Sequence, residues 1–257
     1  MAPNEAPLKT IRILCFGDSL TAGYCYSGTV HAPYNEKLQQ MIEMAFPEYS
    51  IETEEDGRDG DLVTSKVGFV RRISDRFASD SPSSYNWTVI LGGTNDLAHG
   101  VSAEALFEDL KRVWDVPLSH KSKVLALTIP EAGVAGARGR KINDTRRRVN
   151  ELIKGYKKEN LHVYDLCAAV PYHSMSEDDR VKYWDDGLHF TPDGYELVGQ
   201  KVGMALVSLL VKDMFKGQTP AKRKRNFPDD DAMFEEEGGD PKSLTTGYIV
   251  VRWKDLE

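Results

Sequence analysis

Residues 11–20 have the sequence IRILCFGDSL, a mostly apolar run that ends at Gly17 and is soon followed by a serine. A short apolar run of this kind is typical of a parallel strand that is buried on both faces. In an open α/β sheet, ligands bind beyond the carboxyl ends of the strands. The stretch therefore predicts a buried first strand that presents Ser19 to a cleft, although such a serine alone is more often a helix N-cap than a nucleophile.

The remaining sequence alternates between strand-like and helix-like segments. Further strands are expected at residues 49–54, 87–91, 123–129 and 161–166. Helical spacing of apolar residues covers residues 34–46, 102–114, 143–158 and 192–211, and a further stripe runs from Val67 to Phe77. Five strands alternating with helices predict a three-layer α/β/α sandwich around a mainly parallel five-stranded sheet.

Composition divides the chain into three parts. We expect an N-terminal extension at residues 1–9, one α/β domain at residues 10–216 and a charged tail at residues 217–257. The tail contains a basic block, Lys222-Arg223-Lys224-Arg225, and then a segment dominated by acids, a composition typical of flexible chain. A protein partner of this tail is one interpretation of it.

Charge and apolar content exclude some functions. The net charge of −7 argues against nucleic acid as the main partner. The longest apolar stretch, residues 202–211, is too short for stable membrane insertion, and no secretory signal precedes residue 10. The three cysteines show no metal-ligand spacing and are expected to be reduced thiols. These features predict a cytoplasmic protein, with nuclear targeting through residues 222–225 as the alternative.

A second block, Asp186-Gly187-Leu188-His189, contains a carboxylate and an imidazole three residues apart. A catalytic histidine needs a carboxylate to fix its tautomer and to stabilise its protonated form, and Gly187 allows the turn that would bring the two together. Asp185 is a rival for this role, but the spacing favours Asp186. A loop hydrogen bond is the structural alternative.

Two further blocks follow predicted strands. Asn95, in Gly93-Thr94-Asn95-Asp96, can offer its side-chain N–H to a developing oxyanion. Gly60 can offer a backbone N–H, and Gly57 can fill the same role. We choose Gly60 because the second strand should have ended there. Taken singly, each block is more typical of an ordinary turn at the end of a strand.

Together, the four blocks resemble the SGNH (GDSL-type) hydrolase family over residues 11–210. The resemblance implies a flavodoxin-like hydrolase domain in which Ser19 is the nucleophile, His189 the general base and Asp186 its orienting carboxylate. The implied oxyanion hole consists of the Ser19 and Gly60 backbone N–H groups and the Asn95 side chain. The implied reaction is two-step hydrolysis of small to medium carboxylic esters, without a metal or an organic cofactor.

Substrate-binding residues are predicted from their proximity to these blocks. Tyr24 and Tyr26 follow the nucleophile, and Trp184 and Leu188 flank the histidine turn, although ordinary packing explains them equally well. The basic run over the 143–158 helix is expected to be a solvated face, with an anion site as the alternative.

Two other functions stay open on the sequence. An acyltransferase would use the same residues and would be separated by a product assay with added alcohol. A non-catalytic protein that acts through its tail is the second, although it would have no need of all four blocks. The sequence lacks the Gly-x-Ser-x-Gly elbow of lipase-type α/β-hydrolases.

Overall fold

A five-stranded parallel sheet with the strand order β4-β1-β5-β6-β7 forms the centre of the computed structural model, which describes residues 8–78 and 85–214. The strands are β1 (Lys9–Asp18), β4 (Tyr49–Arg58), β5 (Trp87–Leu91), β6 (Lys123–Leu127) and β7 (Leu161–Tyr164). The predicted α/β class with a mainly parallel five-stranded sheet is therefore confirmed.

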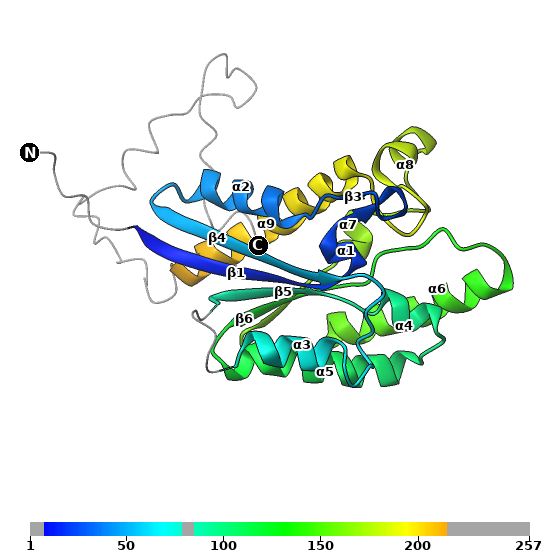
Figure 1. Cartoon of the computed structure of the whole chain (residues 1–257), viewed down its shortest axis with the longest axis horizontal. Helices are drawn as coiled ribbons and strands as arrows, with labels where there is room; N and C mark the ends of the chain where they lie inside the picture. Colours follow the sequence, from blue (N-terminus) through cyan, green and yellow to red (C-terminus); the bar gives the residue numbers. More distant parts are fainter. Residues whose placement is uncertain (1–7, 79–84, 215–257) are drawn as a thin grey trace, which may run out of the picture. The chain divides into compact units, whose positions relative to one another are not determined.

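Helices cover both faces of the sheet (Figure 1). One face carries α2 (Asn35–Ala45) and α9 (Pro192–Met214), and the other carries α3 (Phe69–Arg76), α5 (Ala103–Ser119) and α6 (Gly136–Gly155). The alternation of side chains along β1 separates the two cores: Ile13 and Cys15 belong to the first, Leu14 and Phe16 to the second. This central strand is buried on both faces because each face meets a helical layer.

Short elements follow the strand ends and were not predicted from the sequence. They are α1 (Ser19–Ala22), β2 (Tyr24–Cys25), a 3₁₀ turn (Tyr26–Gly28), β3 (Val30–His31), α4 (Thr94–Ala98), α7 (Leu166–Ala169) and α8 (Glu177–Tyr183). In parallel sheets the carboxyl ends of the strands lie along one edge. The residues that follow β1 and β5 therefore lie at the same edge of the sheet.

Several predicted boundaries were wrong. The second strand was expected to end at residue 54 but continues to Arg58, because Arg72 and Arg76 of α3 bind the acidic side chains of Glu54 and Asp56. Helix α6 begins at Gly136, seven residues before the predicted start, because the glycines at 136 and 139 do not interrupt the helix. Helix α5 extends past residue 114 to Ser119, and β7 ends at Tyr164 because α7 begins at Leu166.

Two predicted regions lie outside the described residues: most of the N-terminal extension, and the tail after residue 216 with its basic block. Within the described part of the chain, no helix combines the length and the apolar character needed to cross a bilayer. All three cysteines are free thiols.

Gly57→Ala is predicted to destabilise the protein by about 1–3 kcal/mol, because the added Cβ would collide with the backbone of Ala22 in α1. Gly155→Ala is the control, since a Cβ there meets no atom within 4 Å and its stability should be equal or slightly higher. Urea denaturation of both variants measures the difference. Equal stability of the Gly57 variant and wild type would contradict the close approach of α1 and β4.

Candidate active site

Ser19 is the first residue of α1, directly after β1 ends at Asp18. The Asp18 carboxylate caps the short helix by accepting a hydrogen bond from the Leu20 N–H at 3.0 Å, and Gly23 ends the helix with a φ of +76°. Ser19 itself is 6% exposed. Its hydroxyl oxygen lies 3.0 Å from Nε2 of His189, a residue 170 positions later in the chain.

His189 is held by the tight turn that begins at Asp186. One carboxylate oxygen of Asp186 lies 2.9 Å from Nδ1 of the His189 ring, and the other accepts the backbone N–H groups of Leu188 and His189 at 2.9 and 2.8 Å. Gly187 has a φ of +79°, which allows the chain to reverse here. The structure thus brings Ser19, His189 and Asp186 into one continuous line of hydrogen bonds.

The turn also controls the charge of Asp186. Burial opposes ionisation, but the hydrogen bonds from the backbone and ring of His189 and from the Leu188 N–H outweigh it and lower the pKa of the carboxyl. Asp186 therefore carries a negative charge beside the imidazole at neutral pH. That charge accepts the hydrogen bond of the ring at Nδ1 and so fixes the orientation of the imidazole.

Asp185 has a different contact from Asp186. Its carboxylate accepts the backbone N–H of Tyr26 at 2.7 Å and so holds the hairpin formed by β2 and β3 against the histidine turn. The turn is closed by a bridge between Trp184 and Phe190 and by a hydrogen bond of 2.9 Å from the Asp185 N–H to the His189 carbonyl. The geometry therefore places Asp186, and not Asp185, on the imidazole.

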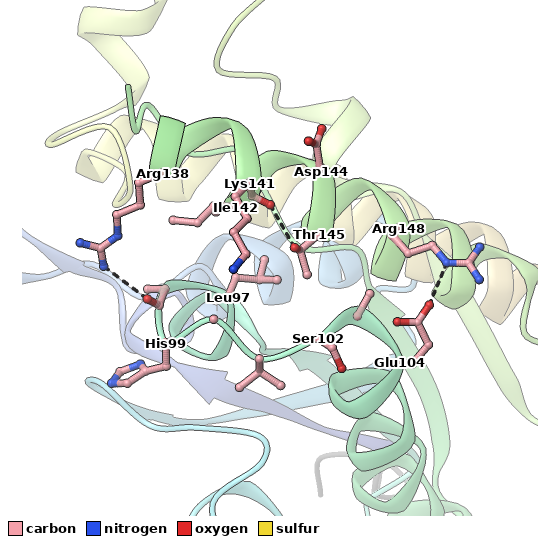
Figure 2. A pocket seen from close by; sticks show the side chains of 14 residues that line it. Leu97, His99, Ser102, Glu104, Arg138, Lys141, Ile142, Asp144, Thr145 and Arg148 are labelled. Atoms are coloured by element: carbon pink, nitrogen blue, oxygen red, sulfur yellow. Dashed lines mark hydrogen bonds and ion pairs between the residues drawn. The ribbon is translucent and has the colours of Figure 1, made fainter. Parts of the chain in front are cut away.

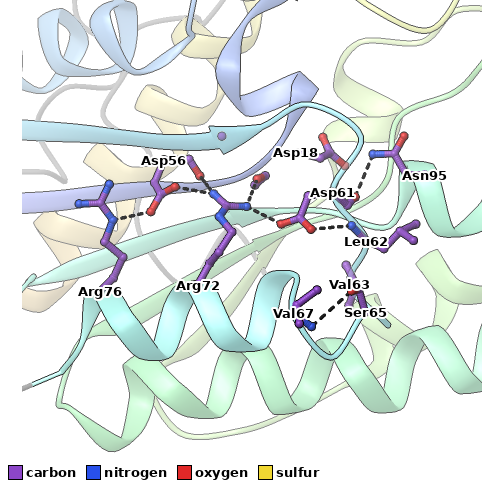
Figure 3. Close-up of polar contacts among 12 residues, drawn as sticks. Asp18, Asp56, Asp61, Leu62, Val63, Ser65, Val67, Arg72, Arg76 and Asn95 are labelled. Atoms are coloured by element: carbon purple, nitrogen blue, oxygen red, sulfur yellow. Dashed lines mark hydrogen bonds and ion pairs between the residues drawn. The ribbon is translucent and has the colours of Figure 1, made fainter.

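Gly60 lies in the loop after β4, and Asn95 lies in α4, shortly after the end of β5. Gly60 follows the end of β4 with a φ of +72° and open space around it, whereas Gly57 lies inside β4 against α1. The side-chain amide of Asn95 donates to the carbonyl of Asp61 at 2.9 Å, which joins α4 to the loop after β4 (Figure 3). The structure thus brings Asn95 next to the loop that carries Gly60.

Asp96 and Arg72 hold the loop that carries Gly60, and no role was predicted for either residue. The buried Asp96 carboxylate accepts the N–H groups of Val63 and Thr64 and the Thr64 hydroxyl at 2.7–3.0 Å. Arg72 binds Asp61 at 2.6 Å, pairs with Asp56 and donates to the Gly17 carbonyl at 3.1 Å (Figure 3). Asp96 lies within one of the quoted blocks, but no local signal marked Arg72.

The four residues that were predicted to bind substrate lie in different surroundings. The Tyr24 ring lies 4.6 Å from the His189 ring between centroids, and Leu188 lines a cavity beside the turn. Tyr26 is exposed, whereas Trp184 is 3% exposed and packs in the core against Phe190 and Tyr172. Of the four, Tyr24 therefore lies beside His189 and Leu188 beside the cavity.

A cavity of about 150 Å³ lies between Asn95 and the histidine turn. Its lining is mainly apolar and includes Leu97, Ile129, Ala132, Ile142 and Leu188. In the described part of the chain, no three His, Cys, Asp or Glu side chains are grouped as a metal ion would require.

Known proteins resemble this chain in sequence and in fold. Residues 15–197 match the GDSL-like lipase/acylhydrolase family. Similar solved structures include a lipase/acylhydrolase from Enterococcus faecalis (24% identity, TM-score 0.57, 77% of this chain and 96% of that one). Others are a carbohydrate acetylesterase family member from Sinorhizobium meliloti (15%, 0.59, 78% and 99%) and an acetylxylan esterase from Geobacillus stearothermophilus (17%, 0.55, 76% and 93%). At these identities the structures show a shared fold, and no curated protein matched the sequence.

Asp18→Asn is predicted to raise stability above pH 7 and to leave it unchanged at pH 4. Burial, with a smaller contribution from the Asp96 and Asp61 carboxylates, raises the pKa of Asp18 from 3.8 to about 7. The folded state therefore holds this proton more tightly than the unfolded state, and wild type loses stability as the pH rises from about 4 to about 7. Asparagine keeps the cap but has no charge. The free energy of unfolding of the variant should therefore exceed that of wild type by on the order of 2–4 kcal/mol at pH 8.

Urea denaturation of both proteins at several pH values between 4 and 8 measures this gain. Equality at the acidic end serves as the internal control. A difference between the two proteins that does not change with pH would show that Asp18 is already ionised in the folded protein.

Proposed function

Because the chain belongs to the GDSL-like lipase/acylhydrolase family, we propose that it hydrolyses small to medium-sized carboxylic esters through an acyl-enzyme on Ser19. The family assignment confirms the resemblance found in the sequence. The observation that supports the mechanism is the line of hydrogen bonds from Asp186 through His189 to the Ser19 hydroxyl, at the carboxyl end of β1. Nucleophile, base and orienting carboxylate are arranged as acyl transfer requires.

In the proposed first step, the Ser19 oxygen attacks the ester carbonyl carbon while Nε2 of His189 takes the serine proton. The tetrahedral intermediate then collapses, the bond to the leaving oxygen breaks, and His189 gives its proton to that oxygen. In the second step a water attacks the acyl-enzyme with His189 again as base, which releases the acid and restores Ser19. Every proton transfer uses groups of the chain itself.

The negative charge of the intermediate is proposed to be held by the Ser19 and Gly60 N–H groups and the Asn95 amide. The hydrogen bond from Asn95 to the Asp61 carbonyl, together with the Asp96 and Arg72 contacts, fixes these donors before substrate arrives. Donors that are already oriented do not reorganise during the reaction, and for this reason such groups make a large contribution to rate.

The cavity beside Asn95 is proposed to receive the acyl group. A cavity of about 150 Å³ is close in size to one that holds benzene, so it fits an acyl group of few carbons. Two structurally similar proteins are named an acetylxylan esterase and a carbohydrate acetylesterase family member, which supports a short acyl group.

Ser19→Ala and His189→Ala are each predicted to lower kcat on p-nitrophenyl acetate by about 10³-fold or more, because each breaks the hydrogen-bonded line. Asn95→Ala should lower it by about 10²- to 10³-fold through loss of one oxyanion donor. Ser208→Ala, at an exposed serine of α9, is the control and should match wild type. A Ser19→Ala variant with the wild-type rate would overturn the proposal.

The cavity volume predicts that kcat/KM falls by about tenfold or more between the butyrate and the octanoate p-nitrophenyl esters. Ile142→Ala enlarges the cavity and should move the preference toward longer acyl groups, whereas Val181→Ala on exposed α8 should not. A flat profile in wild type would show that the acyl group lies elsewhere.

A further inference from the structure

A groove of about 620 Å³ adjoins the proposed acyl cavity (Figure 2). It lies between the segment from Leu97 to Glu104 and the first half of α6. Leu97, Ala98 and Ile142 line both the groove and the cavity, so the two hollows share a wall. An acyl chain that passes these three residues from the cavity would reach the groove.

Positive charge gathers on the α6 side of this groove. Arg148 is paired with Glu104 at 3.1 Å, and Asp144 is paired with Arg147, which does not line the groove. Arg138 bonds only a neutral group, the Ala98 carbonyl at 3.3 Å, and the Lys141 ammonium has no hydrogen bond or ion pair within residues 8–78 and 85–214. Two cations of the groove are therefore not neutralised by the described chain.

Figure 2 shows the Arg138 and Lys141 side chains extending from α6 toward the segment that contains Leu97 and His99. Arg138 and Lys141 lie in the first two turns of α6. The first turn of α6 contains no acidic residue, and Ala135 provides no side-chain cap. Cations in the first turn of a helix are repelled by the helix dipole. Arg138, in the first turn, is thus unfavourable for the helix, and an anion in the groove would compensate its charge.

We propose that the groove binds a carboxylate at the far end of the acyl group, so that the substrates include esters in which one carboxyl of a dicarboxylic acid is free. This inference rests on the proposed function and extends its substrate class. Ala98 lies three residues after Asn95, about 5 Å along α4, and Arg138 reaches beyond it. An anion held by Arg138 and Lys141 is therefore roughly 5–10 Å from Asn95, the length of an acyl chain of about six carbons.

The test is the binding of two reaction products, adipate and hexanoate, measured by titration calorimetry at low ionic strength. The two acids have the same chain length and differ only in the second carboxylate. Wild type should bind adipate about tenfold more tightly than hexanoate, because charge-assisted hydrogen bonds to Arg138 and Lys141 are added. Raising the salt concentration should reduce this preference, since the groove is open to solvent.

Arg138→Gln and Lys141→Gln should each lower the ratio of the two affinities severalfold, and the double variant should abolish the preference. Arg147→Gln is the matched control, because Arg147 lies on the same helix, is paired with Asp144 and does not line the groove. Equal binding of adipate and hexanoate by wild type would overturn the inference, and so would a preference that survives in the double variant.

Measurements on the same proteins distinguish a failure of this inference from a failure of the proposed function. Hydrolysis of p-nitrophenyl hexanoate together with equal binding of the two acids would keep the hydrolase and remove the carboxylate site. Tight adipate binding that depends on Arg138 and Lys141, without hydrolysis of any ester, would keep the anion site and remove the proposed reaction.

Discussion

The carboxyl end of β1 lies so close to its neighbours that only glycine fits there, and the position of Ser19 depends on this constraint. Gly17 pairs with Gly57 of β4 on one side and Leu91 of β5 on the other. A Cβ on Gly17 would meet the Thr21 side chain and the Leu91 carbonyl, and one on Gly57 would meet Ala22. Helix α1 can therefore leave the strand at once, and Ser19 faces the edge where β4 and β5 also end.

Charge compensation beside this edge links the fold to the site. Strand β4, at the edge of the sheet, carries three consecutive acidic residues, Glu54, Glu55 and Asp56, although acidic residues are depleted in strands. Arg72 and Arg76 pair with this acidic segment, and Arg72 also binds Asp61 and the Gly17 carbonyl. One guanidinium thus connects the strand before Ser19 with the loop that carries Gly60. Removing one partner of such a buried pair would leave an uncompensated charge.

The features that the sequence could predict are those with a local physical signature. Apolar runs and, for residues 49–54, alternation of residue types located all five strands of the sheet. The strand-end blocks located Ser19, Asn95 and the Asp186–His189 turn, which the structure brings to one edge. The extension of β4 to Arg58 had no local signature, because the arginines that stabilise it lie on a helix beyond the next loop. The position of Trp184 in the core, with Leu188 at the cavity, likewise depends on tertiary packing.

The charges of the groove that the described chain leaves unpaired also could not be predicted from the sequence. The basic residues of α6 were visible in the sequence, where a solvated face was the simpler expectation. Only the structure shows that Arg147 and Arg148 are paired while Arg138 and Lys141 line a groove that adjoins the cavity beside Asn95. Which cations are neutralised depends on carboxylates from other elements, such as Glu104 of α5, and the order of residues does not reveal it.

The central claim, that Ser19 is an activated nucleophile, is tested most directly by covalent labelling with a fluorophosphonate. Such a reagent reacts with a serine whose proton is accepted by a neighbouring base. Mass spectrometry of the labelled, digested protein should find one adduct, on the peptide that contains Ser19, and the label should form far more slowly in His189→Ala. An adduct on a different residue, or a folded protein that takes up no label, would contradict the account.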